Sequence, residues 1–142
     1  MSGPRPLRLP VGSVTVLLGP LVQRRRTMNR LDDASGRCAD GHDALVRRLG
    51  ARRAESAAQR LATVESARTG PTAMVLADRL TDGLDARDRI AVLAALRELA
   101  ASGVAVLVDD IDPVAALAVA DSALRVDERG EVRHEELAYL AS

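Results

Sequence analysis

Three aspartates follow apolar runs that are typical of buried strands, and their carboxylates could do chemistry together. Asp78 comes directly after residues 74–77, and Asp109 and Asp110 come directly after residues 104–108. If the two runs are neighbouring parallel strands, the three carboxylates lie at one edge of the sheet. Carboxylate oxygens at such an edge can hold a divalent cation. The alternative is that Asp78 caps or pairs locally.

Arg79 offers a third interpretation of this edge. It directly follows Asp78, and its guanidinium can bridge to Asp109 or Asp110. An ion pair of this kind would make the edge a structural plug rather than a metal site.

The run Arg24–Arg26 can bind phosphate, nucleic acid or an acidic partner. Three adjacent arginines on a neutral chain are more often a solvated helix start, and we favour that interpretation. No aromatic residue is interleaved with them for base stacking, so nucleic acid is not expected as a partner.

One further cluster contains metal-ligating residue types: Cys38, Asp40, His42 and Asp43. The Cys-x₃-His spacing is not that of a zinc-finger half-site, and no second pair accompanies it. We therefore interpret Cys38 as a free loop thiol. No Ser/His/Asp or Cys/His set with a catalytic signature is found, and we predict no catalytic residues.

The chain must position these groups by alternating strands and helices, which predicts an α/β fold with a mostly parallel sheet. Apolar, β-branched runs predict strands at 13–19, 73–77 and 104–108. A hairpin turn is predicted at 127–130, and residues 1–10 are predicted to be an irregular arm. Helical patterns cover 44–49, 51–67, 86–101, 113–119 and 134–141.

Two of these helices carry clear start signals. Asp85 is expected to cap the helix at 86–101, and Asp112 precedes Pro113 at the next start. Gly103 is placed to end the first of them. Its apolar stripe is expected to contain four residues: Ile90, Leu93, Leu96 and Leu99.

Composition narrows the class of protein. The 142 residues carry 20 basic and 20 acidic side chains, so the formal net charge is zero, which argues against a general nucleic-acid binder. No apolar run reaches transmembrane length and no signal-peptide core precedes Val11, so we expect a cytoplasmic protein without membrane insertion. The single cysteine excludes an internal disulfide. The sequence contains arginine but no lysine and is rich in alanine, a composition that is typical of a high-GC bacterial genome.

One long stretch resembles a known family. Residues 74–85 read MVLADRLTDGLD, residues 103–112 read GVAVLVDDID, and residues 120–126 read ADSALRV before a glycine turn. This resembles the C-terminal half of an ATP-binding cassette (ABC) ATPase domain, in which an apolar strand ends in Asp-Glu-Pro-Thr-Ser-Gly-Leu-Asp. The resemblance implies a three-layer P-loop NTPase-like core. Only 28 residues separate Thr27 from Ser56, so the family's helical subdomain is expected to be largely missing.

The resemblance also assigns candidate nucleotide-binding positions. The strand ending at Gly19 and the following segment are similar to a phosphate-binding loop. Residues 56–60 are similar to a degenerate form of the family's Ser-Gly-Gly-Gln-Arg signature motif. Asp78 takes the place of the magnesium-side carboxylate. The implied nucleotide-binding set is Gly19, Arg25, Thr27, Ser56, Gln59 and Asp85.

Departures from the family pattern fall on the catalytic positions. Arg24 and Arg25 replace the loop's inner glycine and its lysine, and Arg26 replaces the magnesium-binding hydroxyl. Arg79 stands where the general base should be, and a guanidinium cannot accept a proton from water. Ile111 replaces the switch histidine.

We therefore expect residues 11–142 to form a single degenerate ABC-ATPase-like domain without ATP hydrolysis. Its expected role is that of a regulatory or scaffolding module that binds another protein, either a related ABC ATPase or a second copy as a homodimer. Its expected cofactor content is none, or weakly bound ATP and Mg²⁺. The alternative is an ATP- and Mg²⁺-binding protein with slow or partner-assisted hydrolysis.

Overall fold

The computed structural model describes residues 7–31, 36–38, 46–69 and 71–136, and its centre is a six-stranded sheet. The strand order is β4-β5-β6-β2-β7-β8. The first five strands run parallel, and β8 pairs antiparallel with β7. The strand bounds are β2 Val14–Leu18, β4 Val46–Gly50, β5 Met74–Asp78, β6 Ala105–Asp109, β7 Ser122–Val126 and β8 Val132–Glu136. The predicted α/β class with a mostly parallel sheet is confirmed.

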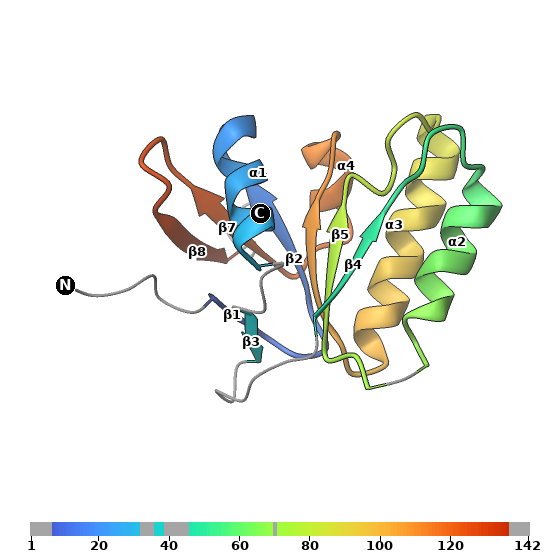
Figure 1. Ribbon diagram of the computed structural model, residues 1–142, viewed down its shortest axis with the longest axis horizontal. Coiled ribbons are helices and arrows are strands. Elements are labelled where there is room, and N and C mark those ends of the chain that lie inside the picture. The colour runs from blue at the N-terminus through green and yellow to red at the C-terminus, as the bar shows by residue number, and fades with distance from the viewer. Residues whose placement is uncertain (1–6, 32–35, 39–45, 70, 137–142) are drawn as a thin grey trace.

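The sheet separates two apolar layers because its central strands are buried on both faces. Successive residues of β2, such as Val16 and Leu17, point to opposite layers. Helices α2 (Ala57–Ser66), α3 (Ala86–Ala101) and α4 (Pro113–Leu117) pack into one layer. Helix α1 (Leu21–Arg30) lies on the other face (Figure 1). The site described below lies between α1 and the carboxyl ends of β5 and β6.

Local signals explain where the helices begin. Ser56 and Gln59 form a reciprocal capping box at the start of α2. Asp85 caps α3 by accepting a hydrogen bond from the Asp88 amide, as predicted. Asp112 likewise caps α4 in front of Pro113, although α4 ends two residues before the predicted position.

Four expectations for local structure are wrong. The helix predicted over 51–67 begins only at Ala57, after a turn. Residues 46–50 form β4 rather than continuing a helix, because pairing with β5 supplies a full parallel ladder that outweighs helical propensity. Residues 134–136 belong to β8 rather than to the predicted helix at 134–141, because the turn at 127–130, itself confirmed, carries the chain back in register along β7. Leu7–Leu9 forms β1, which pairs with β3 (Gly36–Cys38) instead of lying in an irregular arm.

The apolar stripe of α3 is partly as predicted. Leu93, Leu96 and Leu99 are buried, whereas Ile90 is 61% exposed and Val92 takes its place in the core. Among the described residues, no helix is long and apolar enough to cross a membrane.

Candidate functional site

The carboxylates of Asp78 and Asp109 lie side by side at the carboxyl edge of the sheet. They end the neighbouring strands β5 and β6 and are register partners. Asp78 is 8% exposed, Asp109 is 1% exposed, and Asp110, the next residue, is 2% exposed. The predicted acidic edge is therefore present. Charged groups at this depth are stable only when partners compensate for the loss of water.

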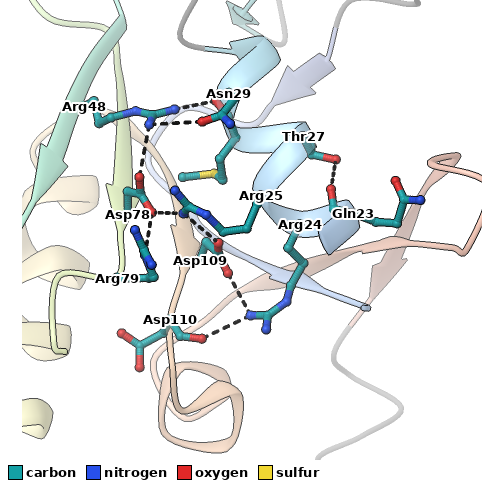
Figure 2. Close-up of polar contacts among 11 residues, drawn as sticks. Gln23, Arg24, Arg25, Thr27, Asn29, Arg48, Asp78, Arg79, Asp109 and Asp110 are labelled. Atoms are coloured by element: carbon teal, nitrogen blue, oxygen red, sulfur yellow. Dashed lines mark hydrogen bonds and ion pairs between the residues drawn. The ribbon is translucent and has the colours of Figure 1, made fainter. Parts of the chain in front are cut away.

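Helix α1 supplies the first two partners. Arg24 Nη1 donates to Asp109 Oδ1 at 2.8 Å and to the Asp110 backbone oxygen at 3.2 Å. Arg25 Nη1 donates to Asp78 Oδ1 and lies 3.7 Å from Asp109 Oδ2. The predicted solvated helix start is wrong for these two arginines, which reach from α1 to the sheet edge (Figure 2).

Strand β4 supplies a third arginine. Arg48 Nη1 lies 3.1 Å from Asp78 Oδ2, so both oxygens of this carboxylate face a guanidinium. Arg48 Nη2 also donates to the Met28 backbone oxygen at 2.7 Å, which ties β4 to α1. We call Arg24, Arg25, Arg48, Asp78 and Asp109 the Arg–Asp cluster.

Arg79 does not form the ion pair with Asp109 or Asp110 that we predicted for this edge. Its side chain is about half exposed, and its Nε lies 3.5 Å from Asp78 Oδ1. Only its backbone amide reaches Asp109, donating to the carbonyl oxygen at 2.7 Å. The bridge from the Arg79 guanidinium to Asp109 or Asp110 is therefore wrong. A φ of +50° at Arg79 turns the chain sharply after β5.

Asp110 is held by a second network. Thr81 Oγ1 donates to Asp110 Oδ1 at 2.7 Å, and the Asp112 amide donates to Asp110 Oδ2 at 3.0 Å. Arg89 Nε donates to Thr81 Oγ1 at 3.3 Å, and Arg89 Nη1 lies 3.6 Å from Asp112 Oδ2. This network connects the loop after β5 to the start of α4.

Burial and pairing act in opposite directions on the carboxyl groups. Burial raises the pKa of Asp109, and the charges of Arg24 and Arg25 oppose that rise. Burial also raises the pKa of Asp110, against the hydrogen bond from Thr81. The hydrogen bond to Asp78 raises the pKa of the Arg25 guanidinium, which stays charged.

The segment predicted to bind phosphate is very short. Only Gly19 and Pro20 separate β2 from α1, and the Arg24 amide already donates to the Pro20 oxygen at 2.9 Å as part of the helix. Gly19 has a φ of +125°, and a Cβ there would lie 2.1 Å from the Val126 backbone oxygen. Close packing against β7 therefore accounts for this glycine.

The other residues assigned from the resemblance are dispersed. Thr27 lies about 200° around α1 from Arg25, and its Oγ1 donates to the Gln23 backbone oxygen at 2.9 Å. Figure 2 shows Thr27 on the side of α1 away from Asp78. Ser56 and Gln59 cap α2 and Asp85 caps α3. Arg25 contacts Asp78, the assigned magnesium-side carboxylate, and Ser56 contacts Gln59 in the α2 capping box, but the structure does not bring these two pairs together at one site.

Arg60, the last residue of the signature-like segment, is buried at 4% exposure. Its Nη1 donates to the backbone oxygens of Leu80 and Asp82, and its Nη2 donates to that of Glu55. This side chain therefore joins the start of α2 to the loop after β5. Sequence reasoning placed Arg60 only as part of a motif.

Sequence reasoning also missed Arg48 and the inward direction of Arg24. A strand prediction for residues 46–50 would have placed the side chains of Arg47 and Arg48 on opposite faces of the sheet, and Arg48 could then have been considered as a partner of the carboxylates. The region of Asp40, His42 and Asp43 lies outside the described residues, as does the side chain of Cys38. Within the described part of the chain, no group of three or more His, Cys, Asp or Glu side chains is arranged to hold a metal ion.

Comparison with solved structures defines the fold. A structure described as the ATP-binding subunit of an ABC transporter shares 12% identity over 91% of this chain and 80% of that chain, with a TM-score of 0.59. An inward-facing metal-chelate-type ABC transporter shares 14% identity over 92% and 74%, with a TM-score of 0.58. No protein-family model and no curated protein matches the sequence. The chain therefore has an ABC-ATPase-like fold, as the resemblance implied.

Proposed function

We propose that this chain is an ABC-ATPase-like domain that does not hydrolyse ATP and acts as a regulatory or scaffolding module for another protein. One observation carries the proposal. Arg24 and Arg25 extend from the first turns of α1 to Asp109 and Asp78, across the space where a nucleotide-binding member of this fold needs phosphates and Mg²⁺.

The connection between β2 and α1 supports the same conclusion. A phosphate-binding loop surrounds its ligand with several free backbone amides. Here the connection has two residues, one of which is Pro20 and has no amide hydrogen, and Gly19 packs against Val126. The residues present do not fit the triphosphate of a nucleotide.

The carboxylate that would face Mg²⁺ is also engaged. Asp78 accepts from Arg25 and lies beside Arg48, and a cation approaching it would meet two fixed positive charges. Arg79 stands beside Asp78 and cannot act as a general base. We therefore propose that Asp78 holds the fold together rather than a metal ion.

The proposed interaction surface is the carboxyl edge of the sheet. Leu21 and Val22 follow β2, while Ile111 and Val114 follow β6, and these two strands are parallel neighbours. All four side chains are exposed, with Leu21 at 58% and Val114 at 78%. Exposed aliphatic groups concentrated at one edge are typical of an interaction site. The proposed partner is a related ABC ATPase or a second copy of this chain.

The pair of substitutions Leu21→Ser and Val114→Ser tests this surface. We expect the double variant to keep its melting temperature, because both side chains are exposed, but to lose association by sedimentation velocity. The measurement uses the chain alone over a concentration series and mixed with an ABC ATP-binding subunit. Val11→Ser is the matched control, since Val11 is exposed at the opposite edge, before β2.

Association that disappears in the double variant and persists in Val11→Ser supports the proposed surface. A wild-type chain that sediments as a monomer in every sample, or a double variant that associates like wild type, would contradict it.

A further inference from the structure

A basic groove lies between α1 and the β7–β8 hairpin. Helix α1 lies alongside the hairpin in Figure 1. The groove is largely open to solvent and has a volume of about 420 Å³. Its lining consists of Gln23, Arg26, Asn29, Arg30, Arg129 and Gly130. We call it the α1–hairpin groove.

The hairpin is held against the helix by specific contacts. Gln23 Nε2 donates to the Glu128 backbone oxygen at 2.9 Å. Gly130 has a φ of +83°, and a Cβ there would lie 3.2 Å from Gln23 Oε1. The Asp127 carboxylate accepts from the amides of Arg129 and Glu131, so it is committed to the turn. These contacts fix the position of Arg129 relative to α1.

The lining concentrates positive charge on a chain whose net charge is zero. Arg26 and Arg30 are one turn apart on α1, and Arg129 faces them from the hairpin turn. No carboxylate from the described part of the chain lines the groove. Among the described residues, Arg26 and Arg129 form no ion pair, in contrast to the inward-facing Arg24 and Arg25.

We propose that the α1–hairpin groove binds a small polyphosphate group. Guanidinium groups bind phosphate oxygens through paired hydrogen bonds, and Arg26 and Arg129 together can contact two phosphate groups of one polyphosphate chain. The Gln23 amide is engaged with the Glu128 backbone oxygen and Asn29 Oδ1 lies 3.5 Å from Arg48 Nη1, so the arginines supply the recognition. Among the lining residues that the structure describes, none has an aromatic side chain on which a base could stack, so the recognised chemistry is the phosphate chain itself.

The groove and the Arg–Asp cluster use different arginines, and Asn29, which lies 3.5 Å from Arg48, is the lining residue that contacts the cluster. Arg24 and Arg25 project from α1 toward the sheet edge, whereas Arg26 lines the groove. Loss of binding in the groove would leave the Arg–Asp cluster unchanged.

Calorimetric titration of the full chain with pyrophosphate, without Mg²⁺ and at low salt, tests the proposal. We expect saturable binding that weakens as salt is raised. The variant Arg26→Gln/Arg129→Gln should bind about tenfold or more weakly, since it loses two charge-assisted contacts. Arg53→Gln/Arg87→Gln is the matched control, because it removes the same charge from exposed arginines outside the groove.

Parallel titrations with ATP and adenosine separate the sources of the phosphate chain. ATP should bind in the same variant-sensitive way as pyrophosphate, and adenosine should give no heat. Absence of saturable heat with pyrophosphate, equal binding by the groove variant, equal loss in the control, or binding of adenosine would each overturn the proposal. Thermal melting of both variants verifies that they are folded.

Discussion

Arg24→Ala is expected to lower the free energy of unfolding by about 3 kcal/mol, because it leaves a buried carboxylate short of its main partner. Asp109 is 1% exposed, and Arg24 supplies its 2.8 Å hydrogen bond. After the substitution, the nearest guanidinium is that of Arg25, 3.7 Å from Asp109 Oδ2. Chemical denaturation with urea measures the change.

Two further variants make this test specific. Arg26→Ala removes the neighbouring arginine, which is exposed on the same helix, and should change stability by less than about 0.5 kcal/mol. The double variant Arg24→Ala/Asp109→Ala should lose less than the sum of the two single variants, because it removes both members of the pair. Strict additivity, or equal effects of Arg24→Ala and Arg26→Ala, would contradict the Arg–Asp cluster as described.

Gly19→Ala is expected to cost about 3 kcal/mol or more, since it combines an unfavourable backbone angle with a steric clash. The φ of Gly19 is +125°, and an added Cβ would lie 2.1 Å from the Val126 backbone oxygen. The clash is with backbone, so relief requires β2 and β7 to separate. Urea denaturation again provides the measurement.

Gly103→Ala separates the two causes. Its φ of +113° is similar, but an added Cβ would have no atom within 4 Å. It should therefore cost only about 1 kcal/mol, the penalty of the backbone angle. If both glycine substitutions cost the same, close packing against β7 is not what requires Gly19, and a role in a loop around a ligand would regain support.

Much of the sheet could be predicted because its central strands are continuous apolar runs. Burial on both faces leaves little ambiguity for β2, β5 and β6. The edge strands differ. β4 contains Arg47 and Arg48, and β8 contains several charged residues. The structure of these two strands is therefore decided by pairing with the neighbouring strand and not by their own composition.

The candidate site was predictable only in part, for a related reason. Parallel pairing of β5 and β6 brings Asp78 and Asp109 together, and that follows from strand ends alone. The partner cations could not be predicted in this way. Arg79 is adjacent in sequence, but its positive φ sends the chain into a turn and its side chain stays half exposed. Arg24 and Arg48 belong to α1 and β4. The local sequence pattern does not specify how these two elements pack against the sheet edge.

The central claim is that the Arg–Asp cluster closes the space that phosphates and Mg²⁺ need. Calorimetric titration with ATP and Mg²⁺, alongside a poorly hydrolysed analogue, tests it most directly. The Arg26→Gln/Arg129→Gln variant is used so that the α1–hairpin groove contributes less heat. We predict no saturable heat that requires Mg²⁺ up to millimolar nucleotide. Saturation at micromolar nucleotide that requires Mg²⁺ and disappears in Asp78→Asn would contradict the claim.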